Sequence, residues 1–320
     1  MKKSSKSSLS SFPSVKDLQP NPYVTLDALV RLQFDAHNFT LLPKQPVQSL
    51  LSGRHASRLR GRGLAFEELR DYRPGDDIRT MDWRATARLR KAHVRVYSEE
   101  RERPTLLVVD QRTNMFFGSI RTTKATAAAE LAALGAWRVL HSGDRVGAIL
   151  FGDHEIVEIR PHRSRKNVLR ICHELTRLNQ ALPSDKTPTI SLNDALRAAA
   201  RIAHHDHLVI LATDYNGDND QTHRIVTRIA AHNDVLAALV YDPLGFELQG
   251  TPGMEATDGR NRIPVDTATA FKERFRKVFD QRIAQLKTNL RSLRIPILPI
   301  CTEESVARQV RTALGQQLRR

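Results

Sequence analysis

The chain has 320 residues and a formal net charge of +15, from 50 Lys and Arg residues against 35 Asp and Glu residues. This length suits one large α/β domain with an additional segment, and a hydrophobic content of 40% is ordinary for a protein with a buried core. The chain has two cysteines with no metal-type spacing between them, which argues against a disulfide framework and favours a reducing compartment.

The N-terminal third contains one expected helix among polar and charged stretches. Residues 1–20 are polar and predict a disordered tail, without the apolar run of a secretory signal. A helix is expected over residues 24–38, followed by an Arg- and Gly-rich loop over 53–63. We expect residues 21–103 to form one charged segment that packs on a sheet. Because no stretch approaches about 18 consecutive apolar residues, we expect no membrane helix and a cytoplasmic location.

From residue 104 onward, short apolar runs alternate with helical patterns. The expected strands cover residues 105–110, 145–151, 155–160, 207–212, 235–241 and 297–300, and a hairpin is expected at 245–265. The expected helices cover residues 122–141, 164–179, a segment capped by Ser191 and Asp194, 224–232, 269–292 and a terminal helix capped by Thr302. This order predicts an α/β domain over residues 104–320, with a doubly wound, mainly parallel sheet covered by helices on both faces.

Two aspartates follow the first and fourth expected strands. Asp110 ends residues 105–110, and Asp214 follows residues 207–212. In the common doubly wound order these strands are neighbours, so both carboxylates face the crevice beyond the carboxyl ends of the strands. Two adjacent carboxylates repel each other, and we therefore expect a positive charge between them.

The strand that ends in Asp110, the Ala-rich helix after it and the Ala212-Thr213-Asp214 run resemble the von Willebrand factor A fold. That resemblance implies a metal-ion-dependent adhesion site, in which octahedral Mg²⁺ leaves one position for a partner's carboxylate. Asp110, Asn114 and Asp214 would be its ligands here, and Thr189 lies near the position of the family's second-loop threonine.

Arg112 departs from the pattern of the family, because it stands where a hydroxyl ligand belongs and has only donors. We expect its guanidinium to lie between Asp110 and Asp214 and to replace the ion with a salt bridge. The expected site is then a degenerate, metal-poor crevice that binds a protein partner, formed by Asp110, Arg112, Asn114, Thr189 and Asp214. No cofactor is expected, with Mg²⁺ as the alternative.

A longer spaced pattern occupies residues 61–90. It reads Gly61-x-Gly63-x-x-Phe66, Arg70-x-Tyr72-x-x-Gly75-Asp76-Asp77-x-Arg79, Asp82-Trp83 and Ala87-Arg88. The pattern is similar to the signature of the domain of unknown function 58 (DUF58) family, whose members carry a von Willebrand factor A-like half, and the resemblance covers about residues 50–240. It implies a non-enzymatic adaptor that works with a MoxR-type AAA+ ATPase in the assembly or maturation of a protein complex.

The signature residues also have a structural interpretation. Pro74-Gly75-Asp76 is typical of a turn. We expect Arg70, Asp76, Arg79, Asp82 and Arg88 to form ion pairs around the Trp83 ring and to clamp the segment to the sheet. The alternative is that exposed members of the signature bind a partner.

Other functions find less support in the residues. A nucleic-acid- or polyanion-binding protein would use its basic surface, with Arg54, Arg58, Arg60, Arg62, Arg90, Lys91 and Arg95 as phosphate contacts, but the interleaved aromatic residues of a single-strand binder are missing. A metal-dependent hydrolase would use Asp110, Asp214 and Asp242, which are few acidic ligands for two-metal chemistry. The run His204-His205-Asp206-His207 has no further ligands at metal spacing, and no Walker phosphate loop is present.

Overall fold

The computed structural model describes residues 21–37, 39, 41, 64–99, 103–182, 187–245, 255–257, 262–264 and 269–315. The chain forms two compact units, one of residues 1–45 with 103–320 and one of residues 46–102. The predicted single segment 21–103 is therefore wrong at its N-terminal end. Its predicted packing on the sheet stays a prediction.

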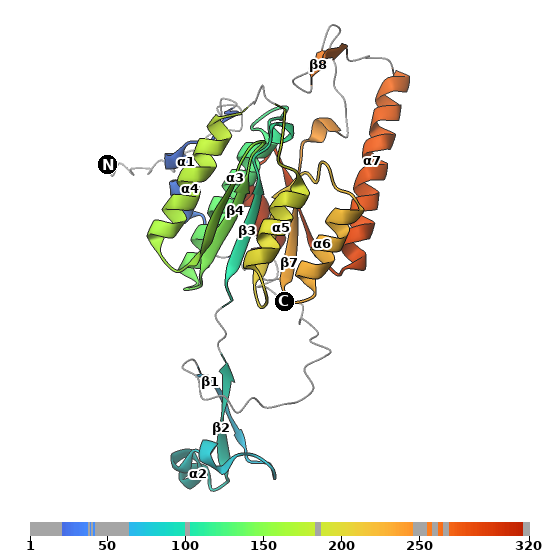
Figure 1. The fold of residues 1–320 in the computed structure, drawn as a ribbon. Helices are drawn as coiled ribbons and strands as arrows, with labels where there is room; N and C mark the ends of the chain where they lie inside the picture. Colours follow the sequence, from blue (N-terminus) through green and yellow to red (C-terminus); the bar gives the residue numbers. More distant parts are fainter. Residues whose placement is uncertain are drawn as a thin grey trace, which may run out of the picture. The chain divides into compact units, whose positions relative to one another are not determined.

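The larger unit is built on a six-stranded sheet with the order β10-β7-β6-β3-β4-β5 (Figure 1). The strands are β3 (Thr105–Asp110), β4 (Val146–Phe151), β5 (Ile156–His162), β6 (Leu208–Thr213), β7 (Asp234–Tyr241) and β10 (Ile297–Cys301). Each pairing is parallel except that of β4 with β5. Counted along the chain, the order is 3-2-1-4-5-6, which reverses between β3 and β6 and is the doubly wound arrangement. The predicted fold class is confirmed.

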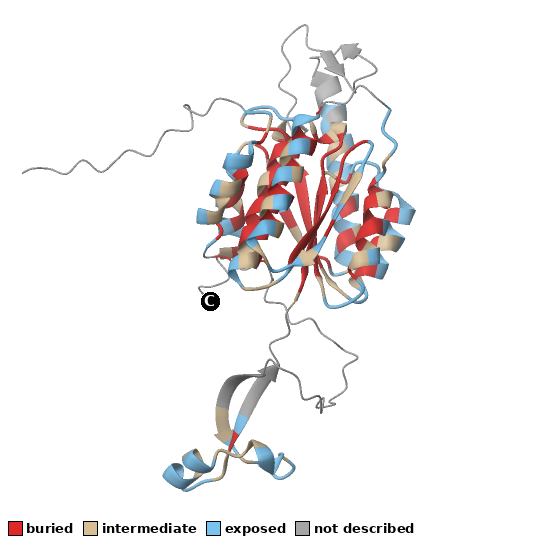
Figure 2. Cartoon of the chain, turned by 60° about the vertical axis from the view of Figure 1, so that its left-hand side comes forward, coloured by how far each residue is buried: buried red, intermediate tan, exposed pale blue. Residues whose placement is uncertain are grey.

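The central strands are apolar on both faces because helices cover both faces. Every residue of β3, β4 and β6 is buried. Leu107 and Val109 join one core cluster with α3 (Lys124–His141), α4 (Arg165–Gln180) and α8 (Val306–Gly315). Leu106 and Val108 join the opposite cluster with α5 (Leu192–Ile202), α6 (Asp220–Ala230) and α7 (Thr269–Ser292). This alternation with a period of two places a helical layer on each side (Figures 1 and 2).

Residues near the N-terminus belong to the larger unit. The predicted helix over 24–38 is shorter in the structure, with α1 (Leu26–Arg31) followed by a 3₁₀ turn, Leu32–Phe34. Trp137 donates its indole N–H to the carbonyl of Leu29 at 3.0 Å, and the buried Asn179 side chain accepts the N–H of Val24 at 2.8 Å. These bonds fasten the segment to α3 and α4.

Helix starts follow local capping where the cap and its partners are close in sequence. The predicted capping box of Ser191 and Asp194 is present at the start of α5. The predicted cap at Thr302 is wrong, because α8 begins at Val306 and the buried Thr302 hydroxyl instead donates to Asp242. The Thr302 hydroxyl therefore bonds a residue distant in sequence, whereas the local pattern predicted that it would cap a helix.

The smaller unit contains a two-stranded antiparallel sheet of β1 (Leu64–Asp71) and β2 (His93–Glu99). Their connection holds a 3₁₀ turn, Ile78–Thr80, and α2 (Trp83–Leu89). A second hairpin, β8 (Glu255–Thr257) with β9 (Arg262–Pro264), occurs where residues 245–265 were predicted to form one. Among the described helices, none combines the length and the apolar character that crossing a bilayer requires.

Candidate functional site

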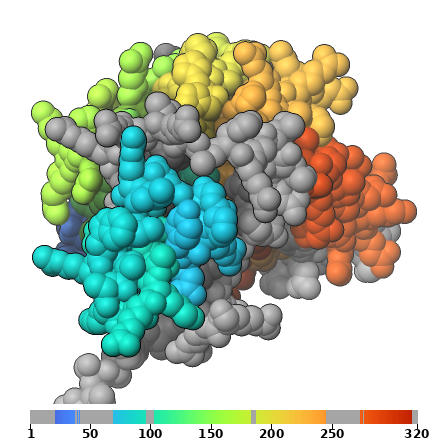
Figure 3. All heavy atoms as spheres, turned by 90° about the horizontal axis from the view of Figure 1, so that it is seen from below, coloured from blue at the N-terminus to red at the C-terminus, as the bar shows by residue number. Residues whose placement is uncertain are grey.

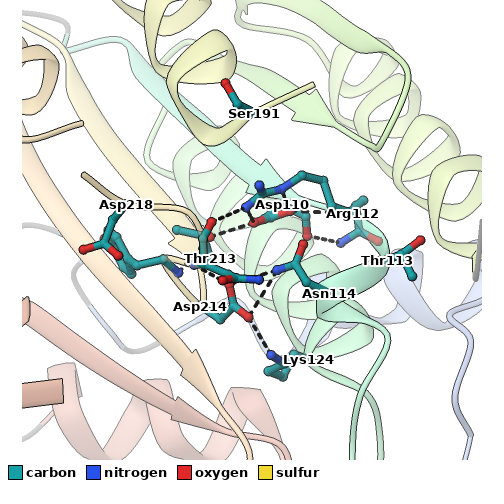
Figure 4. A network of polar contacts seen from close by, with 12 residues as sticks. Asp110, Arg112, Thr113, Asn114, Lys124, Ser191, Thr213, Asp214 and Asp218 are labelled. Atoms are coloured by element: carbon teal, nitrogen blue, oxygen red, sulfur yellow. Dashed lines mark hydrogen bonds and ion pairs between the residues drawn. The ribbon is translucent and has the colours of Figure 1, made fainter. Parts of the chain in front are cut away.

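The candidate site lies at the carboxyl edge of the sheet, where the strand order reverses. Asp110 is the last residue of β3, and Asp214 follows β6, the strand next to it. Figure 4 shows both side chains in one polar network with Arg112, Asn114, Lys124 and Thr213. Reversal points of doubly wound sheets are where ligands bind, because the loops of the two neighbouring strands diverge there.

Asp110 is fully buried and paired with Arg112. One carboxylate oxygen accepts the Nε–H of Arg112 at 3.0 Å and its backbone N–H at 3.1 Å. The other oxygen accepts from Nη2 of Arg112 at 2.6 Å and from the Thr213 hydroxyl at 2.8 Å. Burial raises the pKa of the Asp110 carboxyl, and the Arg112 guanidinium opposes that rise. The pair is a desolvated, fork-shaped ion pair with every carboxylate oxygen engaged.

Asp214 has a different cation. It accepts from the Lys124 ammonium at 2.6 Å, from the Asn114 amide nitrogen at 3.0 Å and from the backbone N–H of Asn216 at 2.8 Å. The further contact of Arg112 Nη2 is the carbonyl of Asn216, at 3.0 Å. The prediction that one guanidinium serves both aspartates is therefore wrong, since Lys124 neutralises the second carboxylate.

Thr189 does not join the two aspartates. Its backbone N–H and its hydroxyl both contact the carbonyl of Asp153, at 2.7 and 3.2 Å. The buried Asp153 carboxylate in turn accepts the backbone N–H of Thr113 at 3.1 Å and the hydroxyl of the same residue. Thr189 thus secures the loop after β4, and its hydroxyl is not directed at Asp110 or Asp214.

The polar side chains at this edge do not form a set of ligands that suits Mg²⁺. That ion needs about six oxygen ligands in a tight octahedral shell. Here the oxygens of Asp110 and Asp214 accept hydrogen bonds from Arg112, Lys124 and amide groups, and Asn114 presents its nitrogen to Asp214. Two fixed cations at the site would also repel a third. Within the described parts of the chain, no group of three or more His, Cys, Asp or Glu side chains is arranged to hold a metal ion.

Asp242, the third acid of the hydrolase alternative, directly follows β7 and is buried. Its carboxylate accepts the N–H of Ser119 at 2.8 Å, the N–H of Leu244 at 2.9 Å and the hydroxyl of Thr302. These contacts tie the loop after β3 to the ends of β7 and β10. Asp242 acts as a structural acceptor here, which weakens the case for two-metal chemistry.

An open pocket of about 280 Å³ lies beside the Lys124–Asp214 pair. Its apolar lining includes Phe117, Leu239, Leu244, Phe279 and Ile283. Arg282 of α7 lines it too and donates to the carbonyl of Tyr215 at 3.0 Å. Tyr215 has a φ of +58°, a costly conformation for a non-glycine residue, and is held in it by Arg282 and by the Thr213 hydroxyl. The loop after β6 is therefore fixed between the ion pairs and the pocket.

The signature residues of the smaller unit divide into two sets. Arg70 forms a two-pronged ion pair with Asp76, with both distances 2.9 Å, and Arg95 contacts Asp82 at 2.8 Å. Asp82 also caps α2 through the N–H groups of Arg84 and Ala85. Trp83 itself is 66% exposed, and of the five residues predicted to pair around its ring, the described contacts join Arg70 to Asp76 but join Asp82 to Arg95 instead, so the predicted arrangement is wrong.

The other signature residues form no ion pairs among the described contacts. In the described part of the unit, the side chains of Arg79 and Arg88 are exposed and have no ion-pair partner. Tyr72 is half-buried and donates its N–H to the carbonyl of Ala92, and Gly75 adopts a φ of +106° in the predicted turn.

Of the proposed nucleic-acid contacts, Arg54, Arg58, Arg60 and Arg62 lie outside the described residues. Arg90, Lys91 and Arg95 are exposed.

The profile of a family described as "Protein of unknown function DUF58" matches residues 68–289, more than half of the chain. The chain belongs to the DUF58 family. Uncharacterized proteins of Mycobacterium tuberculosis and Mycobacterium bovis are each 27% identical to this DUF58 chain over 265 residues, 82% of either length.

Two solved structures are also similar to this DUF58 protein. They are a conserved hypothetical protein BatB from Bacteroides thetaiotaomicron and an aerotolerance-related membrane protein from Bacteroides fragilis, 15% and 14% identical. Each aligns with a TM-score of 0.39 over 68% of this chain, covering 97% and 98% of its own.

Lys124 and Asp153 of this DUF58 protein were not predicted from the sequence. Lys124 is the first residue of α3, where the helix dipole disfavours a positive charge. That conflict is a signal that a nearby carboxylate stabilises the lysine. Asp153 lies in the four-residue connection of β4 to β5 and has the appearance of an ordinary turn residue. Only the tertiary contact with Thr113 shows its role.

Acid should open the ion pairs of the signature segment. The hydrogen bond from Arg70 holds the pKa of Asp76 below its usual 3.8, and the N–H of Ala85 does the same for the pKa of Asp82. Because these pKa values are lower in the folded state, the stability they contribute is present above the unfolded pKa and is lost as pH falls through the folded pKa. We expect both carboxyl carbons to titrate below pH 3.8 in NMR spectra.

Two variants serve as controls for that titration. Arg70→Ala should raise the midpoint of Asp76 and leave that of Asp82 in place, and Arg95→Ala should do the reverse. A midpoint at or above 3.8 in the unaltered protein would contradict the assigned pairs.

Proposed function

We propose that this protein is a non-enzymatic adaptor that docks another protein at the carboxyl edge of its sheet. The observation that carries the proposal is the pairing of Asp110 with Arg112 and of Asp214 with Lys124 beside an open, apolar-lined pocket. In the von Willebrand factor A-like arrangement, this edge carries an ion that receives a partner's carboxylate. Here two built-in cations take the place of the ion.

The partner is proposed to be a MoxR-type AAA+ ATPase, in the assembly or maturation of a protein complex. This part of the proposal comes from the resemblance to DUF58 proteins. The chemistry of the edge is compatible with docking, since a few side chains that fill well-packed, desolvated pockets supply most of the binding energy of protein interfaces. No nucleophile or free general base is needed for such a role.

Phe117 is the side chain best suited to test the site. It lines the pocket, is 45% exposed and lies on the loop that Ser119 fastens to Asp242. Ile120 is on the same loop and is also exposed, but it is not among the residues that line the pocket. The two residues form a matched pair, one inside the proposed contact and one beside it.

The experiment measures binding of the purified chain to the MoxR-type ATPase of the same organism by biolayer interferometry. Phe117→Ala should weaken binding at least tenfold, which corresponds to about 1.4 kcal/mol, and Ile120→Ala should change it less than threefold. Treating the immobilised chain with EDTA beforehand should leave the affinity unchanged. Equal affinities of the unaltered protein and Phe117→Ala, or loss of binding after EDTA, would overturn the proposal.

A further inference from the structure

The connection between β1 and β2 exposes large apolar side chains. Trp83 is 66% exposed and Ile78 is 61% exposed. Figure 3 shows the smaller unit in cyan and teal, with an uneven surface from which groups of atoms project. A tryptophan offers a large apolar area, and tryptophan and arginine are both enriched at binding surfaces.

Three arginines accompany these side chains and take no part in holding the unit together. Arg79, Arg84 and Arg88 are exposed, and in the described part of the chain none of their guanidinium groups forms an ion pair. Arg84 and Arg88 lie one turn apart on the same side of α2. We use the name connection surface for Ile78, Arg79, Trp83, Arg84 and Arg88.

The other charged signature residues fix the shape of this surface. Arg70 and Arg95 pair with Asp76 and Asp82, and Asp82 caps α2 directly before Trp83. The Thr86 hydroxyl accepts the N–H of His93, which joins α2 to β2 at 3.0 Å. A tryptophan presented on a fixed helix loses little conformational entropy when it binds. Some signature residues thus form the ion pairs and the cap that fix the fold of the smaller unit, and others lie exposed on the connection surface.

We propose that the connection surface is a second docking surface, and that it binds an acidic protein segment with an apolar side chain that packs on Trp83. It lies on a different unit from the proposed carboxyl-edge site and does not depend on it. Carboxylates of the partner would complement the positive charge of the three arginines. An apolar side chain of the partner would pack on Trp83 and Ile78.

Two other occupants suit the surface less well. A nucleic acid would stack on Trp83, but the exposed Ile78 side chain offers no stacking face for a second base. In a symmetric dimer the same patch meets itself, which would bring Arg79, Arg84 and Arg88 of both copies together. An acidic peptide segment meets neither obstacle.

The first measurement asks whether Trp83 is accessible in the free chain. The chain has two tryptophans, and Trp137 is buried, so Trp137→Phe leaves Trp83 as the single indole reporter. We expect iodide to quench its fluorescence as it quenches a free indole. Shielding of Trp83 in the free full-length chain would overturn the proposal, because the surface would already be covered.

The second measurement uses a phage-displayed random dodecapeptide library, selected on the immobilised full chain. We expect the selected peptides to combine Asp or Glu with an aromatic or aliphatic residue. A synthetic selected peptide should bind Trp83→Ala and Arg84→Glu at least tenfold more weakly than the unaltered chain. Val278→Ala, which removes an exposed apolar side chain of α7, should bind it equally well.

Arg84→Glu separates loss of binding from loss of folding. A glutamate in the first turn of α2 is favoured by the helix dipole, so this variant should fold at least as well as the unaltered chain. Peptides that bind Trp83→Ala as well as the unaltered chain, or no enrichment at all, would overturn the proposal. So would tight binding of oligo-dT that is lost in Trp83→Ala and falls steeply with salt, since it would assign the surface to nucleic acid.

Discussion

Replacing Arg112 with alanine should lower the free energy of unfolding by about 3–5 kcal/mol, because one charge of a buried ion pair is left without its partner. Asp110 is 0% exposed, and the Arg112 side chain supplies two of the hydrogen bonds to its carboxylate. After the substitution, the Thr213 hydroxyl and the backbone N–H of residue 112 remain as donors, and both are uncharged. Urea unfolding at pH 7 measures the loss.

Arg177 provides the matched control. It also contacts two carboxylates, those of Glu155 and Glu174, but its side chain is 43% exposed. Solvent screens such pairs, so Arg177→Ala should cost less than about 1 kcal/mol. If the two alanine variants were equally stable, the Asp110–Arg112 pair would not be the desolvated pair described above. The double change Asp110→Leu with Arg112→Met should recover much of the loss, since apolar residues of similar volume need no counter-charge.

The sheet could be predicted from the sequence because its strands are buried on both faces. The runs over residues 106–109 and 208–212 are continuous and apolar, which distinguishes them from half-exposed strands with alternating polar residues. The aspartates at their ends followed from the same reasoning, because parallel neighbours present their carboxyl ends at one edge. The adjacency of β3 and β6 confirms that step.

Pairings between distant residues could not be predicted in the same way. Lys124 reaches Asp214 across 90 positions, and Asn179 binds Val24 across 155. Local patterns identify a helix start or a strand end, but not which distant group will meet it. The guanidinium of Arg112 was assigned to both aspartates because it was the one cation visible beside Asp110 in the sequence. The structure divides that task between two residues from different elements.

The cancellation of charge at the edge affects what it can recognise. Asp110 with Arg112 and Asp214 with Lys124 are two neutral pairs, although the chain carries +15 overall. A partner's charge therefore gains little at this edge from long-range attraction. The apolar lining of the adjoining pocket is the larger source of affinity, which is why Phe117 is expected to matter more there than any single charge.

Removing both built-in cations should create a Mg²⁺ site. In the double variant Arg112→Ser with Lys124→Ser, the Asp110 and Asp214 carboxylates lose their cations, and a hydroxyl stands at position 112 beside the Asn114 amide. Hard oxygen ligands of this kind favour Mg²⁺. If 10 mM Mg²⁺ exceeds the dissociation constant a hundredfold, it should stabilise the variant by about 2.7 kcal/mol. Urea unfolding with and without Mg²⁺ measures the gain.

The unaltered protein is the first control, and its unfolding should not respond to Mg²⁺, because Arg112 and Lys124 already neutralise both carboxylates. Adding Asp214→Asn to the double variant should remove most of the response, since one of the two carboxylates is lost. Equal Mg²⁺ responses in the double variant and the unaltered chain would mean that the two cations do not occupy the place of an ion. A response confined to the double variant would identify Arg112 and Lys124 as the groups that make the edge independent of metal.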